Sequence, residues 1–301
     1  MIDIIIPAYN AHSTIEKTLM SILMQTIKND VNIYIVNDCS KISYSNIIKK
    51  FDNKLKIKEL NLTENMGPGY ARQYGIEHSK SEYILFLDAD DVLYDCFSLN
   101  NLYKIINNHD IAIGRIYDES IDQFYIHQGC LHGKLYSRKF IEKNNLYFNN
   151  SRNSEDNSFN QLCLIATSNI IYTNDIIYYY YYYQNSEAKK IYKKYELYSM
   201  KDYASNMEWA IEMAIDRNYD TLKIAKLMFN AICYLFSVYC YNINDREVQI
   251  IIDSANQLYK YYVMYGSKLS EEQKKNIYFE YVYYFIPKIS LDEFINKIEK
   301  F

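Results

Sequence analysis

The sequence predicts an α/β fold, in which helices flank a mostly parallel central sheet, followed by an all-helical C-terminal part. Apolar strand patterns alternate with amphipathic helix patterns over the first half of the chain, an order typical of parallel sheets. Residues 83–87 form a fully apolar strand, as expected where both faces of a sheet are covered. After about residue 190 only helical periodicity remains, and no Gly or Pro occurs from residue 134 to 265.

The first 90 residues repeat strand and helix in a regular order. Their apolar spacing predicts strands at residues 2–6, 31–36, 55–60 and 83–87, and helices at 13–25, 43–51 and 68–78. Such strand–helix–strand units are joined by right-handed crossovers, so the carboxyl ends of these strands are expected at one edge of the sheet.

The remaining chain is less regular at first and then uniformly helical. The pattern predicts strands at 111–114, 116–126, 169–172 and 176–183, and helices at 137–143, 154–166, 191–217, 221–241 and 246–264. We therefore predict a first domain over residues 1–190 and a helical domain over residues 191–301. The aromatic faces of the second domain either pack internally or form an oligomer contact.

Composition excludes several classes of protein. The chain of 301 residues is 49% hydrophobic and 23% charged, which indicates a globular rather than a disordered protein. Its net charge of −4 argues against a dedicated nucleic-acid binder. The six cysteines lack zinc spacing, and no run of 18 uncharged apolar residues is present. These features predict a cytoplasmic protein without a transmembrane segment.

Three carboxylates, Asp88, Asp90 and Asp91, follow the apolar strand at residues 83–87. Ligands of open α/β sheets gather at such strand ends. Carboxylates packed there repel one another and lose hydration, and a divalent cation bound to a phosphate offsets both costs. A solvated turn is the alternative for this motif taken by itself.

The same edge of the sheet gathers further candidates for binding a ligand. The glycine-rich segment 65–75 opens a helix, and its backbone N–H groups form a natural anion site that Arg72 can complete with a bidentate contact. The other candidates follow the first two strands: Pro7, Ala8, Tyr9, Asn10 and Asp38.

These motifs resemble those of the family 2 glycosyltransferases, which are inverting enzymes with the GT-A fold. The resemblance covers residues 2 to about 186 and stops before the helical part. It rests on six motifs in the order of the family: IIPAYN at 5–10, VNDCS at 36–40, NMGPGYARQYG at 65–75, LDADD at 87–91, GKLY at 133–136 and SEDNSF at 154–159.

The resemblance implies a role for each matching residue on the donor side. Pro7, Ala8, Tyr9 and Asn10 would line the nucleoside site, and Asp38 would accept a hydrogen bond from the uracil N–H. Asn65, Gly67 and Arg72 would line the nucleotide and the diphosphate. Asp88 and Ala89 would approach the ribose, and Asp90 would bind Mn²⁺ or Mg²⁺, with Asp88 reaching the metal directly or through water.

On the acceptor side, the resemblance implies that Asp156 is the general base. Inversion needs one carboxylate opposite the leaving group to deprotonate an acceptor hydroxyl. Glu155 would orient the acceptor or support the base. The alternative for Glu155 and Asp156 together is an acidic pair at the start of a helix, stabilised by the helix dipole.

Two departures from the family pattern concern the region behind the diphosphate. Basic residues of relatives are replaced here by Tyr181 and Tyr183, and Lys189 and Lys190 are candidates to substitute for them. His132, just before the GKLY motif, contacts substrate or metal in one interpretation and is a structural histidine in the other.

The sequence thus predicts metal-dependent transfer of a sugar from a UDP-sugar to a hydroxyl of a glycan or other polymer. The helical part would select the acceptor or mediate homo-oligomerisation. Two alternatives remain at this level: a non-catalytic module that binds sugar nucleotides, and a nucleotidyltransferase. The second lacks the glycine-rich, basic phosphate loop expected after Ile6.

Overall fold

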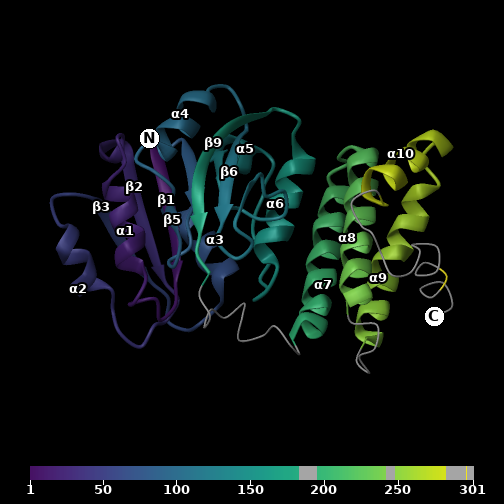
Figure 1. Cartoon of the computed structure of the whole chain (residues 1–301), viewed down its shortest axis with the longest axis horizontal. Coiled ribbons are helices and arrows are strands. Elements are labelled where there is room, and N and C mark those ends of the chain that lie inside the picture. The colour runs from purple at the N-terminus through teal and green to yellow at the C-terminus, as the bar shows by residue number, and fades with distance from the viewer. Residues whose placement is uncertain (183–194, 242–247, 283–295, 297–301) are drawn as a thin grey trace. The chain divides into compact units, whose positions relative to one another are not determined.

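The computed structural model describes residues 1–182, 195–241, 248–282 and 296. The chain separates into two compact units. The first comprises Met1–Cys163 with Thr167–Tyr183, and the second comprises Leu164–Ala166 with Gln184–Phe301. In Figure 1 the colours run from the purple and teal strands of the first unit to the green and yellow helices of the second.

The first unit is built on one nine-stranded sheet with the order β3-β2-β1-β4-β8-β6-β9-β5, and β7 pairs with β6 outside this path. Strands β3, β2, β1 and β4 run parallel. Strand β8 lies antiparallel between β4 and β6, and β5 is antiparallel to β9. The strands are β1 (Ile2–Ala8), β2 (Val31–Asn37), β3 (Lys56–Asn61), β4 (Tyr83–Phe86), β5 (Val92–Leu93), β6 (Ile111–Asp118), β7 (Gln123–Tyr125), β8 (Lys134–Ser137) and β9 (Ile170–Tyr180).

Helices cover this sheet and confirm the predicted fold class. They are α1 (Ile15–Leu23), α2 (Ser45–Ile48), α3 (Pro68–His78), α4 (Ser98–Ile105), α5 (Arg138–Lys143) and α6 (Glu155–Ala166). The helix predicted over 43–51 consists of α2 and a short 3₁₀ turn, Lys49–Phe51. Two predicted strands, 169–172 and 176–183, form the single strand β9, whose pairing with β6 is irregular between Ile113 and Ile116.

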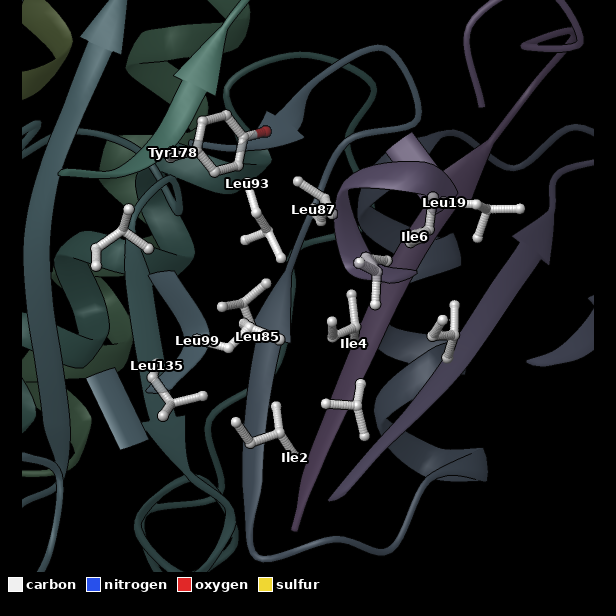
Figure 2. Packing of buried hydrophobic residues seen from close by; sticks show 14 of the residues in the cluster. Ile2, Ile4, Ile6, Leu19, Leu85, Leu87, Leu93, Leu99, Leu135 and Tyr178 are labelled. Carbon is white, nitrogen blue, oxygen red and sulfur yellow. The ribbon is translucent and has the colours of Figure 1, made fainter. Parts of the chain in front are cut away.

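The core on one face of the sheet follows from the alternation of side chains along β1. Ile2, Ile4 and Ile6 are fully buried and point to the same face. Figure 2 shows Ile6 next to Leu19 of α1, and Ile4 near Leu85 of β4. Their burial stabilises the parallel half of the sheet and fixes where each of its strands ends.

On the opposite face, a glycine allows α3 to pack closely against the sheet. A Cβ atom at Gly75 would lie 2.4 Å from Cγ2 of Ile5 and 3.3 Å from Cγ2 of Val36, so any larger residue would push the helix away. This contact fixes α3 against β1 and β2. Arg72, one turn earlier in α3, is thereby held in a fixed place.

The amino edge of the sheet carries a buried carboxylate, Asp3, that is fully enclosed by donors. It accepts hydrogen bonds from the backbone N–H groups of Lys80 (2.8 Å) and Ser81 (2.6 Å), from the Ser81 hydroxyl (2.7 Å) and from the Asn32 amide (2.9 Å). Arg138 supplies the countercharge at 3.3 Å. This network ties β1, β2 and the start of α5 together where no ligand is expected.

The second unit is helical, as predicted. It contains α7 (Tyr195–Asp216), α8 (Thr221–Tyr241), α9 (Gln249–Gly266) and α10 (Glu271–Val282). Apolar side chains of α7, α8 and α9 fill its core, among them Met207, Ile232 and Leu258. By length and composition, one stretch within α8, Thr221–Cys240, would also be able to cross a membrane; 56% of that window is buried inside the structure, as is common for core helices.

Candidate functional site

The carboxyl ends of β1, β2 and β4 meet at one edge of the sheet, as the sequence predicts. The backbone N–H of Asp38, which follows β2, donates to the carbonyl of Ala8 at the end of β1 (2.9 Å). Leu87, just after β4, donates in the same way to Ile5 (3.1 Å). The residues that follow these three strands, which the sequence predicts to bind the UDP-sugar, are therefore neighbours in space.

Arg72 is the centre of the site because it joins two acidic motifs that lie far apart in the sequence. Its guanidinium donates to Asp88 at 2.7 Å and to Glu155 at 2.7 Å. The side chain is 6% exposed. Burial disfavours its charge, but the carboxylates of Asp88, Glu155 and Asp156 outweigh burial and raise the pKa of Arg72. The third nitrogen, Nε, is buried and has no hydrogen-bond partner among the described residues.

The same pairing sets the charge states of the two carboxylates apart. Burial alone would raise the pKa of Asp88, but the Arg72 charge and the hydrogen bond from His132 hold it well below its usual range. Burial and the neighbouring Asp156 raise the pKa of Glu155 to about 7 against the opposing effect of Arg72. One partner of Arg72 is thus firmly ionised, and the other titrates near neutrality.

A second glycine allows α6 to approach α3 closely enough for this contact. A Cβ atom at Gly69 would lie 2.6 Å from Cγ of Glu155 and 3.0 Å from the carbonyl oxygen of Asn149. The sequence motif around residue 69 therefore has a packing role besides exposing backbone N–H groups.

Asp156 stands one residue after Glu155 in the first turn of α6 and is half-buried. Ser154 occupies the N-cap position of α6, but its side chain makes no capping hydrogen bond and its backbone is left-handed, with φ +62°. Non-glycine residues adopt this conformation uncommonly, most often in turns. The turn aims the start of α6 at the edge of the sheet.

The carboxylates of the acidic loop have different surroundings. Asp91 is buried and accepts hydrogen bonds from the Tyr178 hydroxyl (2.7 Å) and the Tyr181 backbone N–H (2.9 Å). Burial and the charge of Asp90 raise the pKa of Asp91. The Asp90 carboxylate has no hydrogen bond to another described side chain or to the described backbone beyond its own residue. Burial and the charge of Asp88 raise the pKa of Asp90 to about 6.

His132 lies in this acidic group rather than in the apolar core. Its Nε2 is 3.3 Å from Asp88, and its ring stacks on Tyr178 with centroids 4.5 Å apart. One ligand atom each from Asp88, Asp91 and His132 lie within 4.8 Å of one another, a grouping able to hold a metal ion. This position is compatible with the interpretation in which His132 contacts substrate or metal. That role stays a prediction.

Asp38 holds the glycine-rich segment in place. Its two oxygens accept hydrogen bonds from the backbone N–H groups of Met66 (2.7 Å) and Gly67 (2.9 Å). Gly67 has φ +90°, a conformation that favours glycine. Both oxygens keep a second lone pair for another donor. The role of Asp38 toward uracil stays a prediction.

Asn65 is held by a residue that the sequence did not single out. Arg152 donates to the Asn65 side-chain oxygen (2.8 Å) and to its carbonyl oxygen (2.7 Å). Arg152 is exposed and precedes α6. No sequence pattern marks it, because isolated arginines are common on protein surfaces. Arg152 places a second cation beside the glycine-rich segment.

The segment after β1 presents one exposed ring beside a turn held by hydrogen bonds. Tyr9 is 52% exposed, whereas Ala8 is buried and Pro7 half-buried. Asn10 has φ +52°, and its backbone N–H donates to the Ser40 hydroxyl (2.9 Å). Tyr9 is therefore available to stack on a planar ligand at this edge.

Ala89 and Lys134 have structural contacts. The carbonyl of Ala89 accepts from the Thr18 hydroxyl of α1 (3.1 Å). Lys134 is fully buried and donates to the carbonyls of His127 (2.5 Å) and Cys130 (2.6 Å). It supports the loop that carries His132.

Of the four residues considered at the places of the family's basic residues, the structure describes only Tyr181. Tyr181 lies at the end of β9 with its backbone on Asp91, and Lys17 of α1 sits 3.3 Å from the centroid of its ring. Tyr183, Lys189 and Lys190 lie outside the described residues. Lys17 of α1 is a cation near this position that no sequence motif marks.

Comparison with known proteins agrees with the motifs. Residues 3–162 match the sequence profile of the family described as Glycosyl transferase family 2. The glycosyltransferase GlyA of Streptococcus pneumoniae is 33% identical over 165 residues, which cover 52% of this chain and 23% of GlyA. The poly(ribitol-phosphate) β-N-acetylglucosaminyltransferase TarP of Staphylococcus aureus is 34% identical, over 38% of this chain and 36% of TarP. The chain thus spans well under half the length of these relatives.

Among solved structures, residues 1–349 of S. aureus TarS in complex with UDP-GlcNAc superpose with a TM-score of 0.72. The match covers 85% of this chain and 80% of that one at 19% identity, which shows a common fold. A mannosyltransferase from Pyrobaculum calidifontis, in complex with GDP-Man and Mn²⁺, superposes less well, with a TM-score of 0.51 at 13% identity.

Proposed function

The chain belongs to glycosyl transferase family 2, and we propose that it transfers a hexose or N-acetylhexosamine from a UDP-sugar to a hydroxyl, with inversion and with a divalent metal. The observation that carries the proposal is the Arg72 bridge. It brings the loop 88–91 and the start of α6 into one site. The carboxylates proposed to hold the metal and the proposed base would thereby face the same bound UDP-sugar.

We propose that Mn²⁺ or Mg²⁺ is held by Asp90 and Asp88, and the donor set of this loop fits such an ion. Hard divalent cations prefer carboxylate oxygens. The Asp90 carboxylate makes no hydrogen bond to other described residues, whereas both oxygens of Asp91 already accept one. Bound there, the metal would offset the negative charge that develops on departing UDP.

We propose that Asp156 acts as the general base. It would accept the proton of an acceptor hydroxyl while that oxygen attacks the anomeric carbon and the bond to UDP breaks on the opposite side. Glu155 and Arg72 hold the turn that carries Asp156. The expected role of Glu155 toward the acceptor remains a prediction, because its carboxylate is bound to Arg72.

The donor proposal rests on the edge of the sheet and on the relatives. Tyr9 would stack on the base, Asp38 would accept from the uracil N–H, and Arg72 Nε would meet a phosphate oxygen. TarP is named as an N-acetylglucosaminyltransferase, and the TarS structure contains UDP-GlcNAc. We therefore propose UDP-GlcNAc as the first donor to test, and UDP-glucose as the second, because a relative from Bacillus spizizenii is named as a poly(ribitol-phosphate) β-glucosyltransferase.

We further propose that residues 1–190 form the catalytic domain and residues 191–301 select a glycan or polymer acceptor or mediate homo-oligomerisation. A cytoplasmic site of action would supply UDP-sugars. None of the six cysteines forms a disulfide, as a reducing compartment favours.

The experiment is UDP release from a panel of UDP-sugars in water, with Mn²⁺ and with EDTA. Slow metal-dependent release from one donor is the expected result. Tight binding of UDP without release, even when polymer acceptors are added, would favour a non-catalytic module. Release of pyrophosphate instead of UDP would indicate a nucleotidyltransferase.

A further inference from the structure

The four tyrosines 178–181, at the end of β9 and directly after it, are divided between two faces of the sheet. Tyr178 and Tyr180 stack against His132, with ring centroids 4.5 and 5.6 Å away, and so face the acidic loop. Tyr179 and Tyr181 point to the other face, as alternation along a strand requires, and their rings lie 4.3 Å apart. Packing within the site accounts for the first pair and leaves the second unexplained.

Tyr179 and Tyr181 belong to a group of aromatic rings, which we call the aromatic platform: Tyr94, Tyr117, Phe124, Tyr179 and Tyr181. The Tyr117 ring centroid is 4.8 Å from those of Phe124 and Tyr179, and Tyr94 stacks on Tyr179 at 6.4 Å. Tyr94 is 38% and Phe124 41% exposed. Tyr117, Phe124 and Tyr179 lie in β6, β7 and β9, and Tyr94 and Tyr181 directly follow β5 and β9. The platform therefore spans several strands and is not a side-chain cluster of one loop.

Carboxylates line the polar edge of the platform. The Tyr117 hydroxyl donates to Asp122 (2.7 Å) and the Tyr179 hydroxyl to Glu119 (3.3 Å). Ring faces and hydrogen-bond acceptors thus occur side by side. A pyranose has the matching character, since its C–H face packs on the negative face of an aromatic ring while its hydroxyls donate at the ring edge.

We propose that the aromatic platform binds a neutral glycan chain of the acceptor; this rests on the transferase function proposed above. Tyr181 links the platform to the acidic loop through its backbone. Tyr181 gives its ring to the platform and its backbone N–H to Asp91. Asp91 in turn binds Tyr178, the ring that stacks on His132. Strand β9 runs in the same direction as β4, so the carboxyl end of β9, which Tyr181 follows, lies at the same edge of the sheet as the acidic loop, and a chain lying on the platform would reach that edge.

Two other occupants fit the platform less well. With two rings about 40% exposed and three half-buried, it offers roughly 300 Å² of aromatic surface, whereas a stable dimer buries about 800 Å² on each partner. A phosphate-linked polymer would meet Glu119 and Asp122. Two cations also border the platform, since Lys17 and Arg115 lie over Tyr181 and Phe124, at 3.3 and 5.8 Å from the ring centroids. The two cations balance the two carboxylates, and a neutral chain matches such a surface better than an anionic polymer does.

The test titrates the full chain with linear oligosaccharides of glucose and of N-acetylglucosamine, measured by calorimetry and by tyrosine NMR signals. We expect at least one to bind, and Tyr94→Leu and Phe124→Leu each to weaken it about three- to tenfold. Tyr172→Leu is the matched control, because Tyr172 is 49% exposed on the same strand but lies outside the platform. This variant should bind like the wild type.

Four results would overturn the proposal. These are no binding of any neutral oligosaccharide, binding that both platform variants retain in full, binding only of a ribitol phosphate polymer, or self-association lost in the platform variants without sugar binding. The donor assay separates this proposal from the transferase function. Oligosaccharide binding without UDP release from any donor, even when acceptors are present, would support the platform and refute the transferase function. UDP release without oligosaccharide binding would support the transferase function and refute the platform.

Discussion

The two edges of the central sheet each carry buried carboxylates, but they satisfy them differently. At the amino edge, Asp3 is enclosed by four hydrogen bonds from backbone and side chains and by Arg138. At the carboxyl edge, Asp88 shares Arg72 with Glu155, and Asp90 has no such partner among the residues described. The first network is complete without a ligand, and the second is not.

This difference separates stability from function within one sheet. A buried carboxylate that is fully hydrogen-bonded holds neighbouring elements together, and its removal leaves donors unpaired. Carboxylates that lie close together and have a raised pKa destabilise the folded state once they ionise. Such groups cluster at functional sites, where a bound ligand offsets their charge. We therefore expect amino-edge variants to lose stability and carboxyl-edge variants to lose activity.

The largest effect is expected for Asp156→Asn at the carboxyl edge. Loss of a general base lowers a transfer rate by about 10²–10⁴-fold, whereas UDP affinity and melting temperature should stay near those of the wild type. Asn157→Ala is the control one residue further along α6. Transfer by Asp156→Asn at the wild-type rate would refute the base assignment.

The next largest effect is expected at the amino edge. Asp3→Ala removes the countercharge of Arg138 and leaves several buried donors unpaired, so unfolding should become easier by about 3 kcal/mol or more. Denaturant melts measure this. Glu142→Ala is the matched control, since its contact with Arg138 is 3.8 Å long and Glu142 is 64% exposed. If the folded fraction of Asp3→Ala also lost metal-dependent UDP binding, the division between the two edges would be wrong.

A third variant, Asp90→Ala, should remove the metal dependence of donor binding. We expect the affinity for UDP in the presence of Mn²⁺ to fall about 100-fold, or ~2.7 kcal/mol, while affinity in EDTA changes little. Calorimetry with and without the metal measures both. Asp95→Ala, in the exposed turn that follows β5, is the control. Unchanged affinity of Asp90→Ala with Mn²⁺ would shift the metal assignment to the group of Asp88, Asp91 and His132.

How far the sequence predicts these edges depends on the range of the contacts. Strand ends and the acidic loop follow from apolar patterns and are local, so the parallel half of the sheet was predicted nearly to the residue. The Arg72–Glu155 pair joins residues 83 positions apart, and no local pattern marks it. Arg152 and Lys17 were missed for the same reason, because each acts through one tertiary contact.

The mixed half of the sheet shows the same limit. The strand predicted over 116–126 became the end of β6, a turn and β7, and Asp122 in that turn has φ +51°. The pattern over residues 176–183 predicts a strand, but it does not identify the partners that the alternate rings face. Such partners depend on the register of β9 against β5 and β6, which neighbouring strands set.

The smallest expected effect concerns pH, and it sharpens the comparison of the edges without a large change in structure. The pKa of Asp90 is raised to about 6 in the folded state by burial and by Asp88. The folded state therefore holds this proton more tightly than the unfolded chain, so the stability from this group is fully present below the unfolded pKa and is lost as pH rises through about 6. A bound cation removes that loss, because it favours the ionised carboxylate. Mn²⁺ should thus raise the melting temperature clearly at pH 7.5 and little at pH 5, and Asp90→Asn should flatten this difference. An equal Mn²⁺ effect at both pH values would separate Asp90 from metal binding.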